Sequence, residues 1–417
     1  MASVLVYIEA EGDGPTPATT RAIAAGRRLA TSLGAELAGV VVVSAPPGSD
    51  GAPADPAVAT HSGLAARLAT GGIDKVVLAT AVGPIEPRLW ATVGPTLAAV
   101  CDQLRPGIVI VPAGDAADEL APRLAAHLGA LLVRRGELAP APRLTLLGRG
   151  PRPQEIDLDD LDRALVFDSS ATEAAEARGD ADAEILLLAV DRPGDPALRL
   201  VPAGAPLDGP TTRTEPGEGD GDRAGTLGRA VVTLALTGAG AEVVALSAMA
   251  GARDPGRWVA IAGGPDRTGA LAAASAAQAG RLVDLVDDDF GERDYLGQAQ
   301  VVAAAIRRTG GEVVVADDPV LAGALAELLE RGLVTGVTGL GHGADGLRID
   351  RGDRTLLAHG PVVLAWAEAV APPAPATAAS PTAPPVRESW SLADLGLDAT
   401  TLRHRRRRDR PTGSPPS

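Results

Sequence analysis

Short β-branched segments alternate with longer segments of helical periodicity along the first part of the chain. The clearest strand signal lies at residues 36–43, where four consecutive valines suit a strand that is buried on both faces of a sheet. Residues 88–104 are predicted to form a helix that stops before Pro106-Gly107. A regular order of strand and helix predicts right-handed crossovers and a parallel, doubly wound sheet. The other predicted strands are residues 3–8, 75–79 and 108–112, and the other helices are 18–33 and 118–128.

A second α/β unit follows a stretch rich in Gly, Pro, Asp and Glu at residues 203–225, whose composition is typical of a linker. Before this linker, residues 141–200 are less regular and are expected to add hairpins or a flap to the first sheet. After it, strands are predicted at 242–247, 258–262, 281–286, 312–316 and 334–338, and helices at 268–279, 294–308 and 319–330. Turn residues at 341–346 predict a hairpin that returns along residues 361–366.

The C-terminal part combines an Ala/Pro linker at residues 372–385, a short amphipathic segment at 389–398 and a basic cluster at 403–408. The amphipathic segment is expected to dock on another surface. The basic cluster is either a solvated, disordered terminus or an electrostatic contact to an acidic partner or lipid. We therefore expect two doubly wound, mostly parallel Rossmann-like domains with a disordered tail, divided as 1–202, linker 203–225, 226–370 and 371–417.

Composition excludes several classes of protein. Of the 417 residues 46% are hydrophobic and 22% charged, which is typical of a globular chain. The net charge of −15 argues against a nucleic-acid binder, because phosphate contacts need a basic surface. Lys75 is the only lysine, which excludes a P-loop lysine or a Schiff-base lysine elsewhere in the chain. The single cysteine, Cys101, is expected to be a buried thiol, and no cysteine-based metal site can form.

No segment has the pattern of a membrane span or a secretory signal. Residues 3–8 are apolar but short, and acidic residues follow them. The longest apolar candidate, residues 231–252, carries Glu242 near its middle, and residues 369–386 contain several prolines. We therefore expect a soluble cytoplasmic protein.

Three stretches of the sequence resemble the electron transfer flavoproteins. The strand and loop VIVPAGD at 109–115, followed by DELAPRLAAHLG at 118–129, is similar to the first domain of the alpha subunit. Residues 258–367 resemble the beta subunit in the order of its strands, its glycine–proline turn and its acidic loops. Residues 389–398 are similar to the C-terminal arm of the beta subunit. The resemblance implies an alpha first-domain-like half fused to a beta-like half, both of the adenine-nucleotide-binding type.

The resemblance also implies a function. The expected role is electron relay between a dehydrogenase and a downstream acceptor, which is the work of an electron carrier rather than of a substrate-converting enzyme. FAD, AMP or both are the implied cofactors. The Gly/Thr/Ser-rich flavin loops of the family are not found in this chain, so the flavin would come from a degenerate site or from another subunit. The implied redox partner is a dehydrogenase or a flavin-bearing subunit of a hetero-oligomer. The alternative is a non-redox scaffold of the same fold that binds AMP, ATP or a partner protein.

The candidate cofactor-binding residues lie in two loops of the second unit. In the turn that contains Gly263, Gly264, Asp266 and Thr268, backbone N–H groups, a helix N-terminus and Arg267 could hold a phosphate, although strand–Gly–helix turns are also common without a ligand. The second loop, with Asp317, Asp318 and Gly323, matches the place that holds AMP in the family. Asp317 could bind a ribose, whereas Asp318 is also well placed as a helix N-cap.

No other set of residues carries a recognisable chemistry. His127 follows the core pattern of its helix, so packing or a surface position is favoured over catalysis. No histidine lies at metal-ligand spacing from carboxylates, and no nucleophile elbow is present. The sequence therefore predicts no catalytic residue and no metal site.

Overall fold

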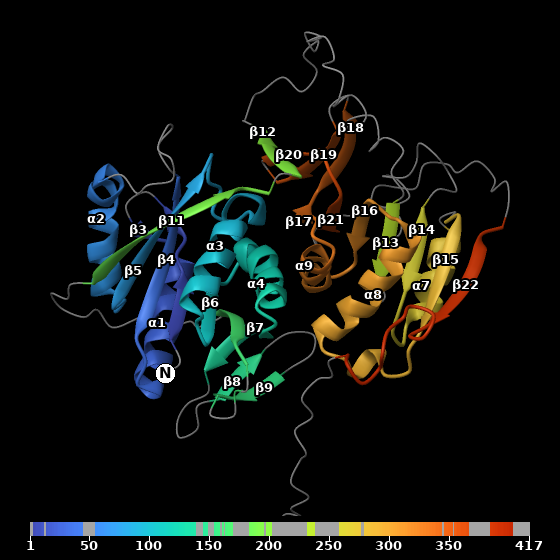
Figure 1. The fold of residues 1–417 in the computed structure, drawn as a ribbon, viewed down its shortest axis with the longest axis horizontal. Coiled ribbons are helices and arrows are strands. Elements are labelled where there is room, and N and C mark those ends of the chain that lie inside the picture. The colour runs from blue at the N-terminus through green and yellow to red at the C-terminus, as the bar shows by residue number, and fades with distance from the viewer. Residues whose placement is uncertain are drawn as a thin grey trace, which may run out of the picture.

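The computed structural model describes residues 3–11, 14–44, 55–138, 145–148, 154–158, 161, 163–169, 183–195, 197–201, 232–237, 258–276, 279–343, 346–352, 354–366 and 384–402. Two α/β halves lie side by side, each with its own sheet (Figure 1). This mixed architecture with largely parallel sheets confirms the predicted fold class. None of the helices in these described ranges combines the length and apolar character needed to cross a membrane.

The first half is built on a nine-stranded sheet in the order β11-β5-β4-β1-β6-β10-β7-β8-β9. Its parallel strands are β1 (Val4–Tyr7), β4 (Leu37–Ser44), β5 (Lys75–Val82), β6 (Ile108–Pro112), β7 (Leu131–Leu138), β10 (Leu165–Ser169) and β11 (Glu184–Pro193). The strands β8 (Thr145–Gly148) and β9 (Gln154–Asp157) extend it as an antiparallel edge. A small ribbon, β2 (Ala10–Glu11) with β3 (Gly14–Pro15), follows β1.

Within the described residues, four helices cover this sheet. One face packs against α1 (Pro17–Leu33) and α2 (Asp55–Thr70), and the opposite face packs against α3 (Trp90–Leu104) and α4 (Asp115–His127). The valines of β4 alternate between the two cores, Val40 and Val42 on one side and Val41 and Val43 on the other. This is the burial on both faces that the valine run predicts.

The second half is built on a seven-stranded parallel sheet in the order β17-β21-β16-β13-β14-β15-β22. Its strands are β13 (Val232–Leu236), β14 (Val259–Ala262), β15 (Arg281–Val286), β16 (Val313–Ala316), β17 (Gly332–Val337), β21 (Val362–Trp366) and β22 (Val386–Ser391). Helices α8 (Tyr295–Thr309) and α9 (Pro319–Leu328) cover one face, and α7 (Arg267–Ala276) lies on the other. A 3₁₀ turn, η3 (Phe290–Glu292), precedes α8.

The two halves repeat one topology. The strand order of the second sheet matches that of the first when each strand is paired with its counterpart. The counterparts of β1, β4, β5, β6, β10 and β7 are, in this order, β13, β14, β15, β16, β21 and β17, and β22 takes the edge position of β11. The helices α3 and α8 correspond in this scheme, have 15 residues each and begin with an aromatic residue, Trp90 or Tyr295. The alternation of strand and helix in the sequence therefore encodes the same unit twice.

The halves meet through helices and through a third sheet. In Figure 1, α4 of the first half lies next to α9 of the second. The third sheet is antiparallel, in the order β12-β20-β19-β18, with β12 (Leu198–Val201), β18 (Gly339–Gly343), β19 (Gly346–Arg351) and β20 (Arg354–Ala358). The strand β12 follows the last strand of the first sheet but pairs with β20, so the chain crosses to the second half before residue 202.

Three expectations differ from the structure. The helix α2 was not predicted, because Gly63 and scattered small residues weaken the periodicity of its sequence. The segment predicted as the return of a hairpin is β21, which enters the parallel sheet between β17 and β16, while β18 pairs with β19. The segment expected to dock on another surface pairs with β15 of its own chain as β22. The strand predicted at 242–247, the linker at 203–225 and the basic cluster lie outside the described residues.

Candidate functional site

The carboxyl ends of β14, β13 and β16 meet at one edge of the second sheet, where doubly wound folds bind ligands. The strand β13 lies between the other two, and its carbonyl groups accept hydrogen bonds from the residues that follow them. After β14, Gly263 N–H donates to Leu236 O at 3.0 Å, and after β16, Asp317 N–H donates to Ala235 O at 3.2 Å. The carboxylate of Asp317 accepts from the backbone N–H of Thr237 at 2.8 Å and from its hydroxyl at 3.3 Å. The structure thus brings Gly263, Gly264 and Asp317 to the same edge.

Both glycines of the predicted turn have a structural reason. A side chain at position 263 would meet the ring of Phe290 at 2.8 Å. Gly264 has a φ of +92°, which side-chain-bearing residues rarely adopt, and its position faces Thr237 O. Packing and backbone conformation therefore account for glycine at both positions, with or without a ligand.

Arg267, the first residue of α7, is committed to other partners. Arg267 forms an ion pair with Asp284 at 2.9 Å, and its Nη1 donates to Gly264 O at 3.2 Å. Asp266 and Thr268 are exposed. The positive charge of Arg267 at the start of the helix is thus paired with the Asp284 carboxylate, and the carboxylate of Asp266 lies at the position before the helix.

The second predicted loop is divided between two roles. Asp318 caps α9, because its Oδ1 accepts from Val320 N–H at 2.7 Å, as cap chemistry predicts. Gly323 lies within α9, where a Cβ would come within 2.7 Å of the Cβ of Pro122 and 2.9 Å of Arg123 N in α4. The structure therefore places Gly323 in a helix–helix contact and does not bring it to the turn after β14.

The described residues at this edge suit a phosphate group poorly. A phosphate needs N–H donors and positive charge, and the loop that carries Phe290 brings exposed Asp288 and Asp289 alongside the glycine turn. Carboxylates only accept hydrogen bonds when ionised, so they match ribose hydroxyl or base amino groups instead.

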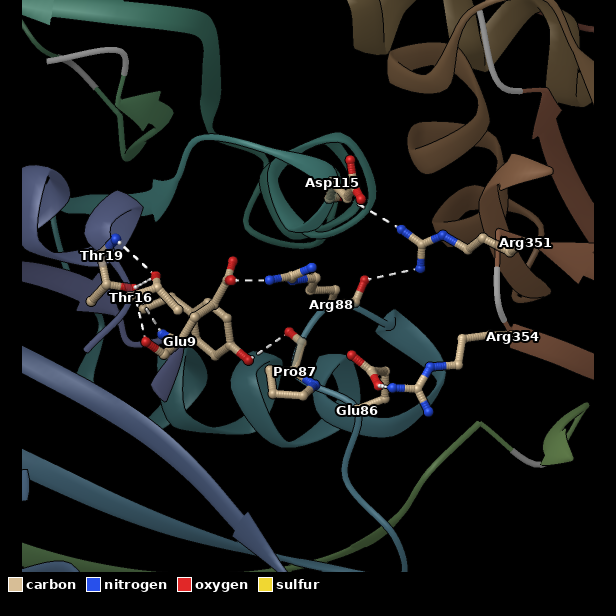
Figure 2. A network of polar contacts seen from close by, with 10 residues as sticks. Glu9, Thr16, Thr19, Glu86, Pro87, Arg88, Asp115, Arg351 and Arg354 are labelled. Carbon is tan, nitrogen blue, oxygen red and sulfur yellow. Dashed lines mark hydrogen bonds and ion pairs between the residues drawn. The ribbon is translucent and has the colours of Figure 1, made fainter. Parts of the chain in front are cut away.

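A second polar cluster lies at the carboxyl edge of the first sheet (Figure 2). Thr16 is the N-cap of α1, and its hydroxyl accepts a hydrogen bond from Thr19 N–H at 3.2 Å. The Thr19 hydroxyl in turn donates to Glu9 O and accepts from Glu9 N–H, both at 3.1 Å. The Glu9 carboxylate faces Arg88 at 3.4 Å. Burial raises the pKa of Glu9, and Arg88 opposes this effect. The Tyr7 hydroxyl donates to Pro87 O at 2.7 Å.

Two arginines from the third sheet reach this edge from the second half. Arg351, at the end of β19, donates to Arg88 O at 3.2 Å and to Asp115 O at 3.5 Å. Arg354, at the start of β20, pairs with Glu86 at 3.1 Å. Figure 2 shows both side chains extending toward the loop before α3 and the start of α4. Arginines of the second half therefore contact the loops at this edge of the first sheet.

Glu119 of α4 is the buried centre of this junction. One oxygen accepts from Trp90 N–H at 2.6 Å, and the other accepts from the N–H and hydroxyl of Thr335 in β17, both at 3.1 Å. Arg351 Nη1 lies 3.2 Å from the same carboxylate. Burial raises the pKa of Glu119, while Arg351 and the three hydrogen bonds oppose that rise. Sequence reasoning missed this residue, because its partners from the second half lie more than 200 positions away.

Residues 4–134 match the family model of the electron transfer flavoprotein domain. This part of the chain is therefore similar to an electron transfer flavoprotein domain. It runs from β1 into β7 and includes α4, so the first stretch of the predicted resemblance is confirmed. No curated protein matches the chain. The polar cluster at Glu9 and the buried carboxylate Glu119 both lie within the matched residues.

Proposed function

We propose that the protein is an electron-transfer-flavoprotein-like component of a relay between a dehydrogenase and a downstream acceptor. In this proposal the chain supplies a rigid two-half scaffold, and a flavin-bearing partner supplies the redox centre. The observation that carries it is the electron transfer flavoprotein domain at residues 4–134, whose helix α4 is joined to a second unit of the same topology. The sequence lacks recognisable flavin loops, which favours a flavin held by the partner.

The same fold supports a second role, as a scaffold that binds an adenine nucleotide without redox chemistry. Its support is the edge where Gly264, in a left-handed conformation, lies near Asp317. We expect a nucleotide there to present its ribose or base to the carboxylates, since Arg267 is already paired with Asp284. The residues proposed to line it are those predicted from the sequence that lie at this edge, Gly263, Gly264, Asp266, Thr268, Asp317 and Asp318. Gly323 is left out, because it packs against α4 inside α9.

The test is an absorbance spectrum of the full chain purified from its native host, followed by nucleotide analysis of the supernatant after heat release. Under the first proposal, the isolated chain is colourless, and flavin bands appear only in fractions that contain a second polypeptide. Flavin at about one equivalent on the isolated chain would keep the redox role and refute the division of labour between scaffold and partner.

A nucleotide without flavin in any fraction supports the second role instead. In that case Asp317→Asn should lower the nucleotide content, and Asp398→Asn should not, because Asp398 caps only the exposed turn at Thr400. A colourless, nucleotide-free chain, with no flavin in any fraction that contains a second polypeptide, would contradict both roles.

A further inference from the structure

The imidazole of His127, the last residue of α4, lies between carboxylates of two other helices. Its Nδ1 is 2.9 Å from Oε1 of Glu327 in α9, and its Nε2 is 3.0 Å from Oδ1 of Asp102 in α3. A carboxylate can only accept, so both contacts are hydrogen bonds only if both ring nitrogens carry protons. The geometry therefore fits the imidazolium form, and a neutral ring would keep one hydrogen bond and turn a lone pair toward the other carboxylate.

The contact between His127 and Glu327 joins the two halves of the molecule. The other oxygen of Glu327 accepts from Arg123 Nε at 3.2 Å. Arg123 in turn lies 3.8 Å from Asp195 and covers the ring of Trp90 at 4.7 Å. Among the described residues, the charged groups around the imidazole are thus Asp102 from α3, Glu327 from α9 and Arg123 from its own helix.

The electrostatics agree with this geometry. The hydrogen bond to Glu327 raises the pKa of His127; Asp102 adds to this rise, and partial burial opposes it. Burial alone would raise the pKa of Glu327, but His127 and Arg123 outweigh it and lower that pKa. Each partner therefore favours the charged form of the other.

We propose that His127 is a pH-sensitive clasp between the two halves, which holds α4 against α9 while the ring is protonated and loosens when the proton leaves. A group whose pKa is higher in the folded state stabilises that state fully below its unfolded value, about 6.5 for histidine, and loses this contribution as the pH rises through the folded value. The ion pair between Arg123 and Glu327 remains in place between α4 and α9 when the imidazole loses its proton, so the halves loosen without separating. The clasp is independent of whether a nucleotide or flavin binds.

The test is amide hydrogen exchange of α4 and α9 in the full chain between about pH 5 and about pH 9, corrected for intrinsic exchange rates. The opening equilibrium of these helices should rise by up to about tenfold for each unit by which the folded pKa exceeds the unfolded one. Helix α1, on the opposite face of the first sheet, serves as the internal reference. His127→Gln should remove the pH dependence, and His359→Gln, at an exposed position after β20, should leave it unchanged.

Titration of the histidine ring signals by NMR in the unmodified chain gives an independent readout. A His127 signal that titrates at or below the ordinary histidine value would overturn the proposal. Equal exchange of α4 and α9 on both sides of the measured pKa would also overturn it, because the ring would then titrate without affecting the contact between the halves.

Discussion

Replacing Glu119 by alanine tests the junction of the two halves at its centre. The side chain is fully buried, accepts three hydrogen bonds and pairs with Arg351, whose side chain is 12% exposed. Removing one partner of a buried pair costs about 3–5 kcal/mol, and each orphaned donor costs about 1–3 kcal/mol. The two costs cannot be added, because the broken ion pair and the orphaned donors share partners. The native state also holds the Glu119 carboxyl away from water, and its removal relieves that desolvation cost. We therefore expect Glu119→Ala to lower the free energy of unfolding by about 3–5 kcal/mol.

Chemical unfolding followed by circular dichroism measures this loss. Arg351→Ala should show a similar cost, and the double variant should cost less than the sum, because each single change already breaks the pair. Arg348→Ala is the matched control on the same strand as Arg351. Its pair with Asp350 is partly exposed, with 42% and 32% of the two side chains accessible, so its expected cost is within about 1 kcal/mol. A change below about 1 kcal/mol for Glu119→Ala would refute the view that this carboxylate joins the halves.

Three further substitutions test other parts of the structure by the same unfolding measurement. Gly323→Ala forces a Cβ against Pro122 and should lower the free energy of unfolding by about 1–3 kcal/mol. Gly269→Ala, at an open position of α7, is the control and should raise it by up to about 1 kcal/mol. Equal effects of the two substitutions would contradict the contact between α9 and α4. Asp318→Ala removes the cap of α9 and should cost about 1 kcal/mol, and no change would show that the cap is dispensable. Trp390→Ala removes the buried aromatic anchor of β22 and should cost about 3–5 kcal/mol, with faster proteolysis at residues 384–402; unchanged proteolysis would argue against the anchor.

Strands with a strong local signal could be predicted closely from the sequence. The strand β6 lies at the residues expected, and the N-cap and glycine C-cap that bound α8 are local chemistry. The strand β13 was missed, because it begins a long apolar run in which periodicity cannot separate a strand from a helix. The strand β21 was assigned to a hairpin by its neighbouring turn, although its buried residues on both faces suit a central parallel strand.

The candidate site was predictable only in part, since sequence spacing does not reveal which glycines serve packing between distant segments. Gly263 and Gly323 read alike in the sequence, as small residues in or near loops at strand ends. In the structure, one lies against Phe290 at the sheet edge and the other against Pro122 of the first half. Only the folded chain separates a glycine at the edge of the sheet from one in a helix contact.

The α4 motif that carries the family resemblance is also the surface that joins the halves. Within DELAPRLAAH, Glu119 binds Thr335 and Arg351, Pro122 faces Gly323, and Arg123 and His127 both bind Glu327. These residues project from one helix at spacings of three and four, so they form one face. The carboxyl edge of the first sheet is contacted by other residues, namely Arg88 of the first half and Arg351 and Arg354 of the third sheet. The shared physical requirement of this segment is therefore the docking of a second α/β unit.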